Sequence, residues 1–194
     1  MASPSSVCVY CGSSSRVNDV YKDAARRLGT GLARAGIEVV YGGGRVGLMG
    51  ILADAALAAG GRVVGIIPAH LQALEVDHGG LSELVVVGSM HERKRMMVDR
   101  ADAFVVLPGG LGTLDETFEV ITWKQLRLHD KPILIADIGG YWAPLIGLFG
   151  RIDGEGFVSG GLQRLFSVVG DIDQVMESLG HQPVPAIPTD SRAM

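Results

Sequence analysis

The sequence predicts an α/β fold of the Rossmann-like, doubly wound kind, a single domain with a mostly parallel sheet and helices on both faces. Two observations carry this prediction. Short apolar runs alternate with amphipathic segments along the 194 residues, and such alternation builds right-handed βαβ units around a parallel sheet. Most of the apolar runs are also β-branched and uninterrupted by polar residues, as expected for strands that are covered on both faces.

The first half of the chain predicts three strands and two helices. Each strand is a short β-branched run, and each helical segment repeats its apolar residues with helical spacing. Glycines follow both helical segments and are expected to end them. In chain order these elements are Ser6–Tyr10, Asp19–Ala35, Ile37–Tyr41, Leu48–Ala59 and Arg62–Ile67, and the helix-ending glycines are Gly36, Gly60 and Gly61.

The second half continues the same pattern as far as residue 137. Three further apolar runs predict strands, and two segments with helical spacing lie between them. These elements are Leu84–Val87, Met90–Arg100, Ala103–Leu107, Leu114–Leu128 and Pro132–Asp137. We expect residues 1–180 to form the domain, and the Pro-rich residues 181–194 to be a flexible or extended tail.

The composition narrows the functional classes. The chain is 47% apolar and 20% charged, which is typical of a globular protein. A net charge of −4 provides no basic field for polyanions, and this argues against binding to nucleic acid or to a membrane surface. No apolar stretch approaches the roughly 20 residues of a membrane span, and residues 1–6 lack the features of a signal peptide. A cytoplasmic location is therefore expected.

The two cysteines, Cys8 and Cys11, form a literal C-x-x-C pattern. A redox pair would place its thiols at the start of a helix, and a zinc site would need further Cys or His ligands. Here Cys8 lies inside a predicted strand and no second pair occurs elsewhere. We therefore expect two ordinary reduced thiols and no metal site.

The first Gly-rich loop, residues 42–50, reads GGGRVGLMG and matches the dinucleotide pattern G-x-G-x-x-G. That pattern also requires an acidic residue about 20 positions later, at the end of the next strand. The next predicted strand runs instead into Pro68, Ala69 and His70, which argues against a nicotinamide cofactor. A tight turn that needs small residues is the other interpretation.

The second Gly-rich loop, residues 108–116, reads PGGLGTLDE and follows a buried strand. Its glycines would let the backbone approach a ligand, and Thr113 is expected to open a helix whose free N–H groups and dipole face a phosphate. No lysine follows the last glycine, so this is not a Walker A loop, and a monophosphate is favoured over ATP. Residues 113–116 also match a capping box, in which Glu116 would cap the helix. Spacing alone therefore does not decide whether Glu116 has a capping role or a functional role.

Between the two loops, residues 89–97 read SMHERKRMM. On a helix, Met90, Arg93, Lys94 and Met97 share one face. A generic helix of this kind would present a solvated charged face with methionine as packing filler. Its position between the two Gly-rich loops instead places its first half beside the crevice at the carboxyl ends of the strands. Both a solvated surface helix and a ligand-binding helix therefore remain open.

Taken together, these segments resemble the LONELY GUY family of cytokinin riboside 5′-monophosphate phosphoribohydrolases. The motifs GGGxxGLMG, SMHERK and PGGxGTxxE, followed by ITWKQL, stand in order and spacing, after the opening CVYCGSSS. The match runs from about Val7 to Leu179. Asp115 stands where many members have Glu, which keeps the charge.

The resemblance implies a Rossmann-like homodimer without a cofactor that hydrolyses the N-glycosidic bond of a nucleoside 5′-monophosphate, such as isopentenyladenosine monophosphate or AMP. The products would be the free base and ribose 5-phosphate. It assigns catalysis to Arg93 and Glu116. It assigns substrate contacts to Glu75, Arg93, Lys94, Gly110, Leu111, Gly112, Thr113, Leu114, Asp115, Glu116 and Thr122. Further candidate substrate-binding residues are Met90, Gly109, Gly43 and Gly44.

The chemistry agrees with this assignment. Departure of a base from C1′ builds oxocarbenium character, which a nearby carboxylate stabilises. Glu116 could supply that charge and activate water, whereas Arg93 stays protonated and is assigned to binding and to orienting Glu116. The proton donor to the leaving base and the identity of that base stay open.

Two other functions were weighed. A non-catalytic carrier of a nucleotide or of molybdenum cofactor on the same fold would need the phosphate cradle but not the Arg93–Glu116 pair. A lysine decarboxylase would need a Schiff-base lysine for pyridoxal phosphate. The four lysines, Lys22, Lys94, Lys124 and Lys131, stand in no recognisable cofactor motif, and we reject this interpretation.

Overall fold

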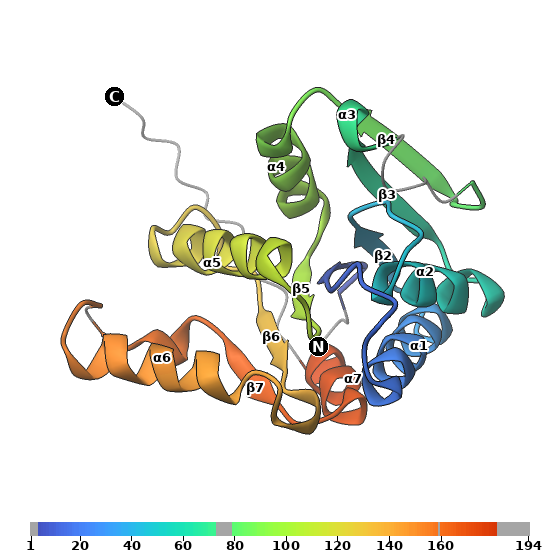
Figure 1. Ribbon diagram of the computed structural model, residues 1–194. Coiled ribbons are helices and arrows are strands. Elements are labelled where there is room, and N and C mark those ends of the chain that lie inside the picture. Colours follow the sequence, from blue (N-terminus) through green and yellow to red (C-terminus); the bar gives the residue numbers. More distant parts are fainter. Residues whose placement is uncertain (1–3, 73–78, 159, 182–194) are drawn as a thin grey trace.

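The computed structural model describes residues 4–72, 79–158 and 160–181. In this part of the chain, seven parallel strands form one sheet in the order β4-β3-β2-β1-β5-β6-β7. Helices cover both faces of the sheet (Figure 1), which confirms the predicted doubly wound α/β class. The elements are β1 Ser6–Tyr10, α1 Asp19–Arg34, β2 Glu38–Tyr41, α2 Leu48–Ala58, β3 Val63–Pro68, α3 Ala69–Gln72, β4 Glu83–Val87, α4 Met90–Arg100, β5 Ala103–Val106, α5 Leu111–Gln125, β6 Ile133–Ala136, η1 Ile138–Gly140, α6 Ala143–Gly154, η2 Leu162–Arg164, β7 Ser167–Val169 and α7 Ile172–His181.

All predicted strands and helices are confirmed, and all but one have bounds within one residue of the prediction. The exception is α5, which runs from Leu111 to Gln125 rather than from the predicted Leu114 to Leu128. The elements that the pattern did not predict are the short α3, and η1, α6, η2, β7 and α7, which follow β6. Gly147 and Gly150 lie inside α6 and lower its helix propensity. Strand β7 has three residues, too few to show a period.

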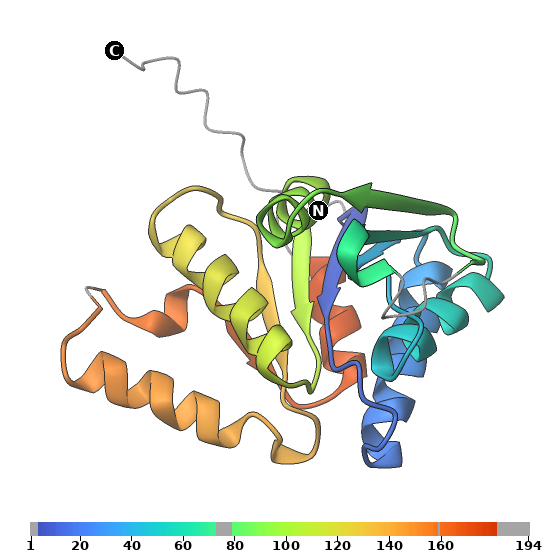
Figure 2. The same cartoon turned by 45° about the horizontal axis from the view of Figure 1, so that its top comes forward.

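The sheet reverses its direction of winding at β1. The chain moves outward from β1 through β2 and β3 to β4, and then returns to place β5 on the other side of β1. Strand β1 therefore pairs with β2 on one edge and with β5 on the other, and β1 and β5 run side by side in Figure 2. In open α/β sheets, ligands bind beyond the carboxyl ends of the strands at this switch point.

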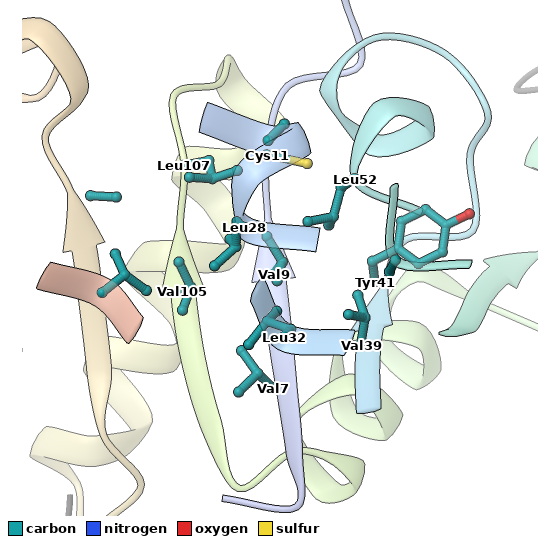
Figure 3. Close-up of a cluster of buried hydrophobic side chains, with 14 of the residues drawn as sticks. Val7, Val9, Cys11, Leu28, Leu32, Val39, Tyr41, Leu52, Val105 and Leu107 are labelled. Atoms are coloured by element: carbon teal, nitrogen blue, oxygen red, sulfur yellow. The ribbon is translucent and has the colours of Figure 1, made fainter. Parts of the chain in front are cut away.

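Two apolar cores lie on opposite faces of the sheet. On one face, Val7 and Val9 of β1 pack with Leu28 and Leu32 of α1 and with Leu52 of α2 (Figure 3). The opposite core contains Cys8 and Tyr10 together with buried residues of α4, α5 and α6. Because both faces are covered, most strands are apolar along their whole length. No helix in the described ranges is long and apolar enough to cross a bilayer.

Candidate active site

Three loops meet at the carboxyl edge of the sheet. They follow β1, β2 and β5. The Gly12 N–H donates to the Pro108 carbonyl at 3.1 Å, and the Leu48 N–H donates to the Gly12 carbonyl at 2.9 Å. A Cβ on Gly47 would lie 2.4 Å from the Ser13 carbonyl carbon, so this position must be glycine for the loops after β1 and β2 to pack. The loop after β1 thus holds the other two in place.

The start of α5 differs from the prediction and changes the interpretation of Glu116. The helix begins at Leu111, Gly110 is its N-cap, and its first backbone bond runs from the Leu114 N–H to the Gly110 carbonyl at 3.0 Å. Thr113 is already the third helical residue, and Glu116 lies in the second turn. The predicted capping box is therefore wrong, because glycines at 109 and 110 let the helix start three residues earlier.

The first N–H groups of α5 are the part of the site that could bind an anion. The N–H groups of Leu111, Gly112 and Thr113 precede the first bond of the helix, so no carbonyl of the preceding turn accepts from them. Gly110, Leu111 and Gly112 are exposed, whereas Thr113 is buried with its Oγ1 against Gly109. The exposed donors are therefore backbone groups at the positive end of the helix dipole, as predicted for a phosphate.

Arg93 of α4 is buried, with its guanidinium at the ends of β2 and β3. Its Nε donates to the Ile66 carbonyl at 3.1 Å and its Nη2 donates to the Gly42 carbonyl at 3.0 Å, so the ends of β3 and β2 fix the guanidinium. Met90, one turn earlier on α4, has its Sδ 3.9 Å from the Arg93 Nη1. The predicted placing of Met90, Arg93, Lys94 and Met97 on one face of α4 agrees with the burial of the last three.

Arg93 and Glu116 both act electrostatically on Cys8, in the middle of β1. Burial raises the pKa of the Cys8 thiol, the negative charge of Glu116 raises it further, and the positive charge of Arg93 opposes this. The pKa of Cys11 is raised by burial and again by Glu116. Helices α4 and α5, which carry Arg93 and the half-buried Glu116, both contact β1.

The raised pKa values keep Cys8 and Cys11 protonated at neutral pH. Both thiols are buried and free, and they belong to the cores on opposite faces of the sheet. They do not form a redox pair with a low-pKa thiolate. Within the described ranges, no three His, Cys, Asp or Glu side chains are placed to hold a metal ion.

Lys94 forms ion pairs with two carboxylates of α5. Its Nζ lies 3.0 Å from Asp115 Oδ2 and 3.2 Å from Glu119 Oε2, and its side chain is only 10% exposed. Burial lowers the pKa of Lys94, but the hydrogen bonds and charges of Asp115 and Glu119 outweigh burial and raise it overall. Glu119 was not predicted as part of this edge, although it lies four residues after Asp115 on the same helix face. Lys94 thus links α4, which carries Arg93, to α5, which carries Glu116.

The remaining predicted residues divide into three groups. Gly43 and Gly44 are buried at the end of β2, beneath the edge, and Leu114 is half-buried in the first turn of α5. Thr122 is exposed on α5, about 9 Å along the helix from Glu116, so one copy of the chain does not bring it to the start of the helix. Glu75 lies outside the described residues, as does the predicted tail after residue 181.

Besides Glu119, two parts of this edge were missed in the sequence. One is the exposed serine segment Ser13–Ser15 in the loop after β1, next to the switch point. Its place after the first strand was the available signal, because that position flanks the crevice of a doubly wound sheet. The other is Tyr141, in the loop after β6, which no local sequence pattern marks.

The described contacts of the four lysines agree with rejecting a Schiff-base role. Lys94 is ion-paired, and Lys22 pairs with Asp19 on the surface. The Lys124 Nζ donates to the Lys131 carbonyl, and the Lys131 Nζ donates to the Val98 carbonyl. Lys124 also lies in the last turn of α5, at the opposite end from the anion-binding start of the helix.

Sequence comparison gives matches over most of the chain. The profile of a family described as "possible lysine decarboxylase" matches residues 49–179. The cytokinin riboside 5′-monophosphate phosphoribohydrolase of Rhodococcoides fascians is 43% identical over 91% of this chain and 89% of its own length. The protein of the same name from Arabidopsis thaliana, LOG1, is 45% identical over 79% of this chain and 72% of its own. A probable rice enzyme of this name, LOGL1 from Oryza sativa subsp. japonica, is 45% identical over 82% and 71%.

Comparison with solved structures identifies the same fold. The molybdenum cofactor carrier protein of Chlamydomonas reinhardtii superposes with a TM-score of 0.70 at 20% identity, over 90% of this chain and 94% of its own. The protein TM1055 superposes with a TM-score of 0.67 at 26% identity, over 89% and 98%. At 20% identity the carrier protein is evidence of a shared fold alone.

Proposed function

The chain belongs to the family of cytokinin riboside 5′-monophosphate phosphoribohydrolases, and we propose from this premise and the site geometry that it hydrolyses a nucleoside 5′-monophosphate. The bond cleaved is the N-glycosidic bond, and the products are the free base and ribose 5-phosphate. The substrate is a cytokinin riboside monophosphate such as isopentenyladenosine monophosphate, or AMP. The observation that carries the proposal is the exposed start of α5, with Glu116 in its second turn, together with Arg93, which carbonyls at the ends of β2 and β3 hold on the neighbouring helix α4.

The phosphate binds at the start of α5 in this proposal. The exposed N–H groups of Gly110, Leu111 and Gly112 and the positive end of the helix dipole hold its negative charge without a metal ion. Glycine at 109 and 110 lets a ligand approach the backbone closely. The phosphate anchors the substrate, and the ribose extends from it toward the second turn of the helix, where Glu116 lies.

Glu116 and Arg93 act on the bond between C1′ and the base nitrogen. As that bond breaks, positive charge develops on the ribose, and the Glu116 carboxylate stabilises it. The same carboxylate accepts a proton from the attacking water, whose oxygen forms the new bond to C1′. Two hydrogen bonds to backbone carbonyls fix Arg93, and its charge binds the substrate and orients Glu116. The base leaves with the bonding electron pair and takes up a proton.

The carrier alternative receives less support. A carrier needs only the anion-binding loops, and the likeness to the Chlamydomonas reinhardtii carrier extends to the fold. The chain also has a buried arginine, Arg93, and a half-buried carboxylate, Glu116, on two neighbouring helices that contact β1, and its relatives at more than 40% identity bear the name of a hydrolase. These two features favour catalysis.

The assembly proposed here is a homodimer located in the cytoplasm. Thr122, Phe118 and Leu126 are spaced four residues apart, form one stripe on α5 and are all exposed. A partner copy that covers this stripe would bring Thr122 of one chain toward the site of the other. This explains how a residue remote from its own anion-binding loop contributes to substrate binding.

The test is base release. The metal-free protein is incubated with AMP and with isopentenyladenosine monophosphate, and the free base is quantified by chromatography. Release by the wild type but not by Arg93→Ala or Glu116→Ala is the expected result. Tight nucleotide binding with no base release by the wild type would contradict the hydrolase and support the carrier.

A further inference from the structure

The loop after β6 brings a tyrosine to the Gly-rich loop before α5. Asp137, which follows β6, accepts a hydrogen bond from the Trp142 N–H at 2.6 Å. Between them the chain turns through Gly139 and Gly140, both with positive φ. Tyr141 therefore faces the carboxyl edge of the sheet, and its hydroxyl donates to the Gly109 carbonyl at 2.7 Å.

The Tyr141 ring is fixed on two sides. It lies edge-on against the buried Trp142, with ring centroids 4.7 Å apart, and edge-on against Tyr21 of α1, at 5.4 Å. The loop after β6 lies near the first turn of α1 in Figures 1 and 2, which agrees with the second contact. Because packing already orients the ring, the hydroxyl is a pre-positioned donor.

The Gly109–Gly110 peptide, whose carbonyl accepts this hydrogen bond, is only weakly oriented by its own backbone. A Cβ on Gly109 would lie 2.1 Å from Thr113 Oγ1 and 2.9 Å from the Gly12 nitrogen, so this position must be glycine. Glycine places few restrictions on its own backbone angles. In a planar trans peptide, the Gly109 carbonyl and the Gly110 N–H point in opposite directions. A bond that fixes the carbonyl therefore also fixes the N–H.

We propose that Tyr141 is a positioning residue for phosphate binding, because its hydroxyl sets the direction of the Gly110 N–H. Gly110 is the N-cap of α5, and its N–H stands next to the free N–H groups of the first turn. The inference rests on the proposed function, in which the substrate phosphate binds there. Without the hydroxyl, the Gly109–Gly110 peptide can rotate, and the binding loop presents this donor only part of the time.

The test is Tyr141→Phe, which keeps the ring and its two aromatic contacts and removes only the hydroxyl. Calorimetry gives the Kd for ribose 5-phosphate and for adenosine, which lacks a phosphate, and steady-state assays with AMP give KM and kcat. We expect ribose 5-phosphate to bind about tenfold more weakly and KM to rise by a similar factor, the size expected for one hydrogen bond to a charged group. Adenosine binding and kcat should change less than about twofold.

Tyr21→Phe is the matched control, because it removes a hydroxyl from the same aromatic pair and keeps the ring. It should leave the Kd for ribose 5-phosphate, the Kd for adenosine, KM and kcat unchanged. Unaltered ribose 5-phosphate binding by folded Tyr141→Phe would overturn the proposal, and so would equal weakening of adenosine and ribose 5-phosphate, which indicates general loosening.

The binding arm does not depend on turnover. If the wild type binds ribose 5-phosphate but releases no base, the proposed function fails, and the binding arm still decides the role of Tyr141. If the wild type does not bind ribose 5-phosphate, both proposals fail.

Discussion

At the scale of single residues, Gly42 leaves space for the Arg93 side chain and also accepts a hydrogen bond from it. A Cβ at this position would lie 2.0 Å from the Arg93 Nη2. The G-x-G-x-x-G pattern in this loop therefore leaves room for a guanidinium beside the sheet. The Gly42 carbonyl then accepts a hydrogen bond from the same Nη2.

Gly42→Ala should therefore displace Arg93 while the fold persists, because the clashing atom is the end of a flexible side chain. We expect kcat/KM for AMP to fall about 100-fold, the loss typical of a catalytic group misplaced by about 1 Å. The melting temperature should fall by only a few degrees. Gly147→Ala in α6, where an added Cβ meets open space, is the control and should keep full activity. Full activity in Gly42→Ala would show that the position of Arg93 is not critical.

Glu116 lies in the second turn of α5, too far from the start of the helix to cap it. Glu116→Gln keeps the shape of the side chain and removes its charge. We expect kcat to fall about 10²- to 10⁴-fold, because the carboxylate acts in the chemical step, and AMP to bind within about threefold of the wild type. Rapid-quench base release and calorimetry would measure the two quantities. A lower melting temperature with unchanged kcat would return Glu116 to a structural role.

At the scale of elements, the ion pairs of Lys94 connect α4 to α5. Lys94→Met should lower the free energy of unfolding by about 1–2 kcal/mol at pH 8, a value reduced from that of a buried pair because Asp115 is 58% exposed. The contribution of Lys94 is present below its ordinary pKa of 10.5, and it is lost as pH rises through the raised pKa of the folded protein. The difference between variant and wild type should thus be constant from pH 7 to 9 and shrink above about 10.5.

Urea unfolding at several pH values would measure this difference. Arg95→Met is a suitable control, because it breaks an exposed ion pair with Asp99 on the same helix. A loss as small for Lys94→Met as for Arg95→Met would show that the connection between α4 and α5 contributes no stability.

The predictability of the elements follows from their surroundings. Strands such as Ala103–Val106 are buried on both faces, so their apolar runs alone identify them. The start of α5 was misplaced because Thr113 and Glu116 match a local capping pattern, whereas tertiary contacts of Gly109 decide where the helix begins. The Tyr141–Gly109 bond joins residues 32 positions apart from different loops, and no local pattern encodes it.

At the scale of the whole molecule, the switch in winding explains where the site lies. Arg93 comes from α4, the helix that crosses from β4 to β5, and is held by the ends of β2 and β3. Glu116 comes from α5, in the half of the sheet beyond β1. The two halves of the fold each supply one member of the pair. The sequence motifs could identify both residues, but only the structure shows that the helices carrying them both contact β1.

The exposed stripe of α5 makes the assembly testable. Leu126 is 63% exposed, so Leu126→Glu should not destabilise an isolated chain. If a second copy covers the stripe, this variant should reduce the mass measured by light scattering from twice the 20.4 kDa of the chain to a single chain. Val86→Glu, at a similarly exposed apolar residue of the edge strand β4, should leave the mass unchanged.

Activity then distinguishes a shared site from a mere contact. If Thr122 reaches the partner's substrate, the monomeric Leu126→Glu should show a KM for AMP raised at least about tenfold, and Thr122→Ala should raise KM without changing the mass. A monomeric Leu126→Glu with the wild-type KM would show that each chain holds a complete site. In that case Thr122 would have no part in substrate binding, and the stripe would serve assembly alone.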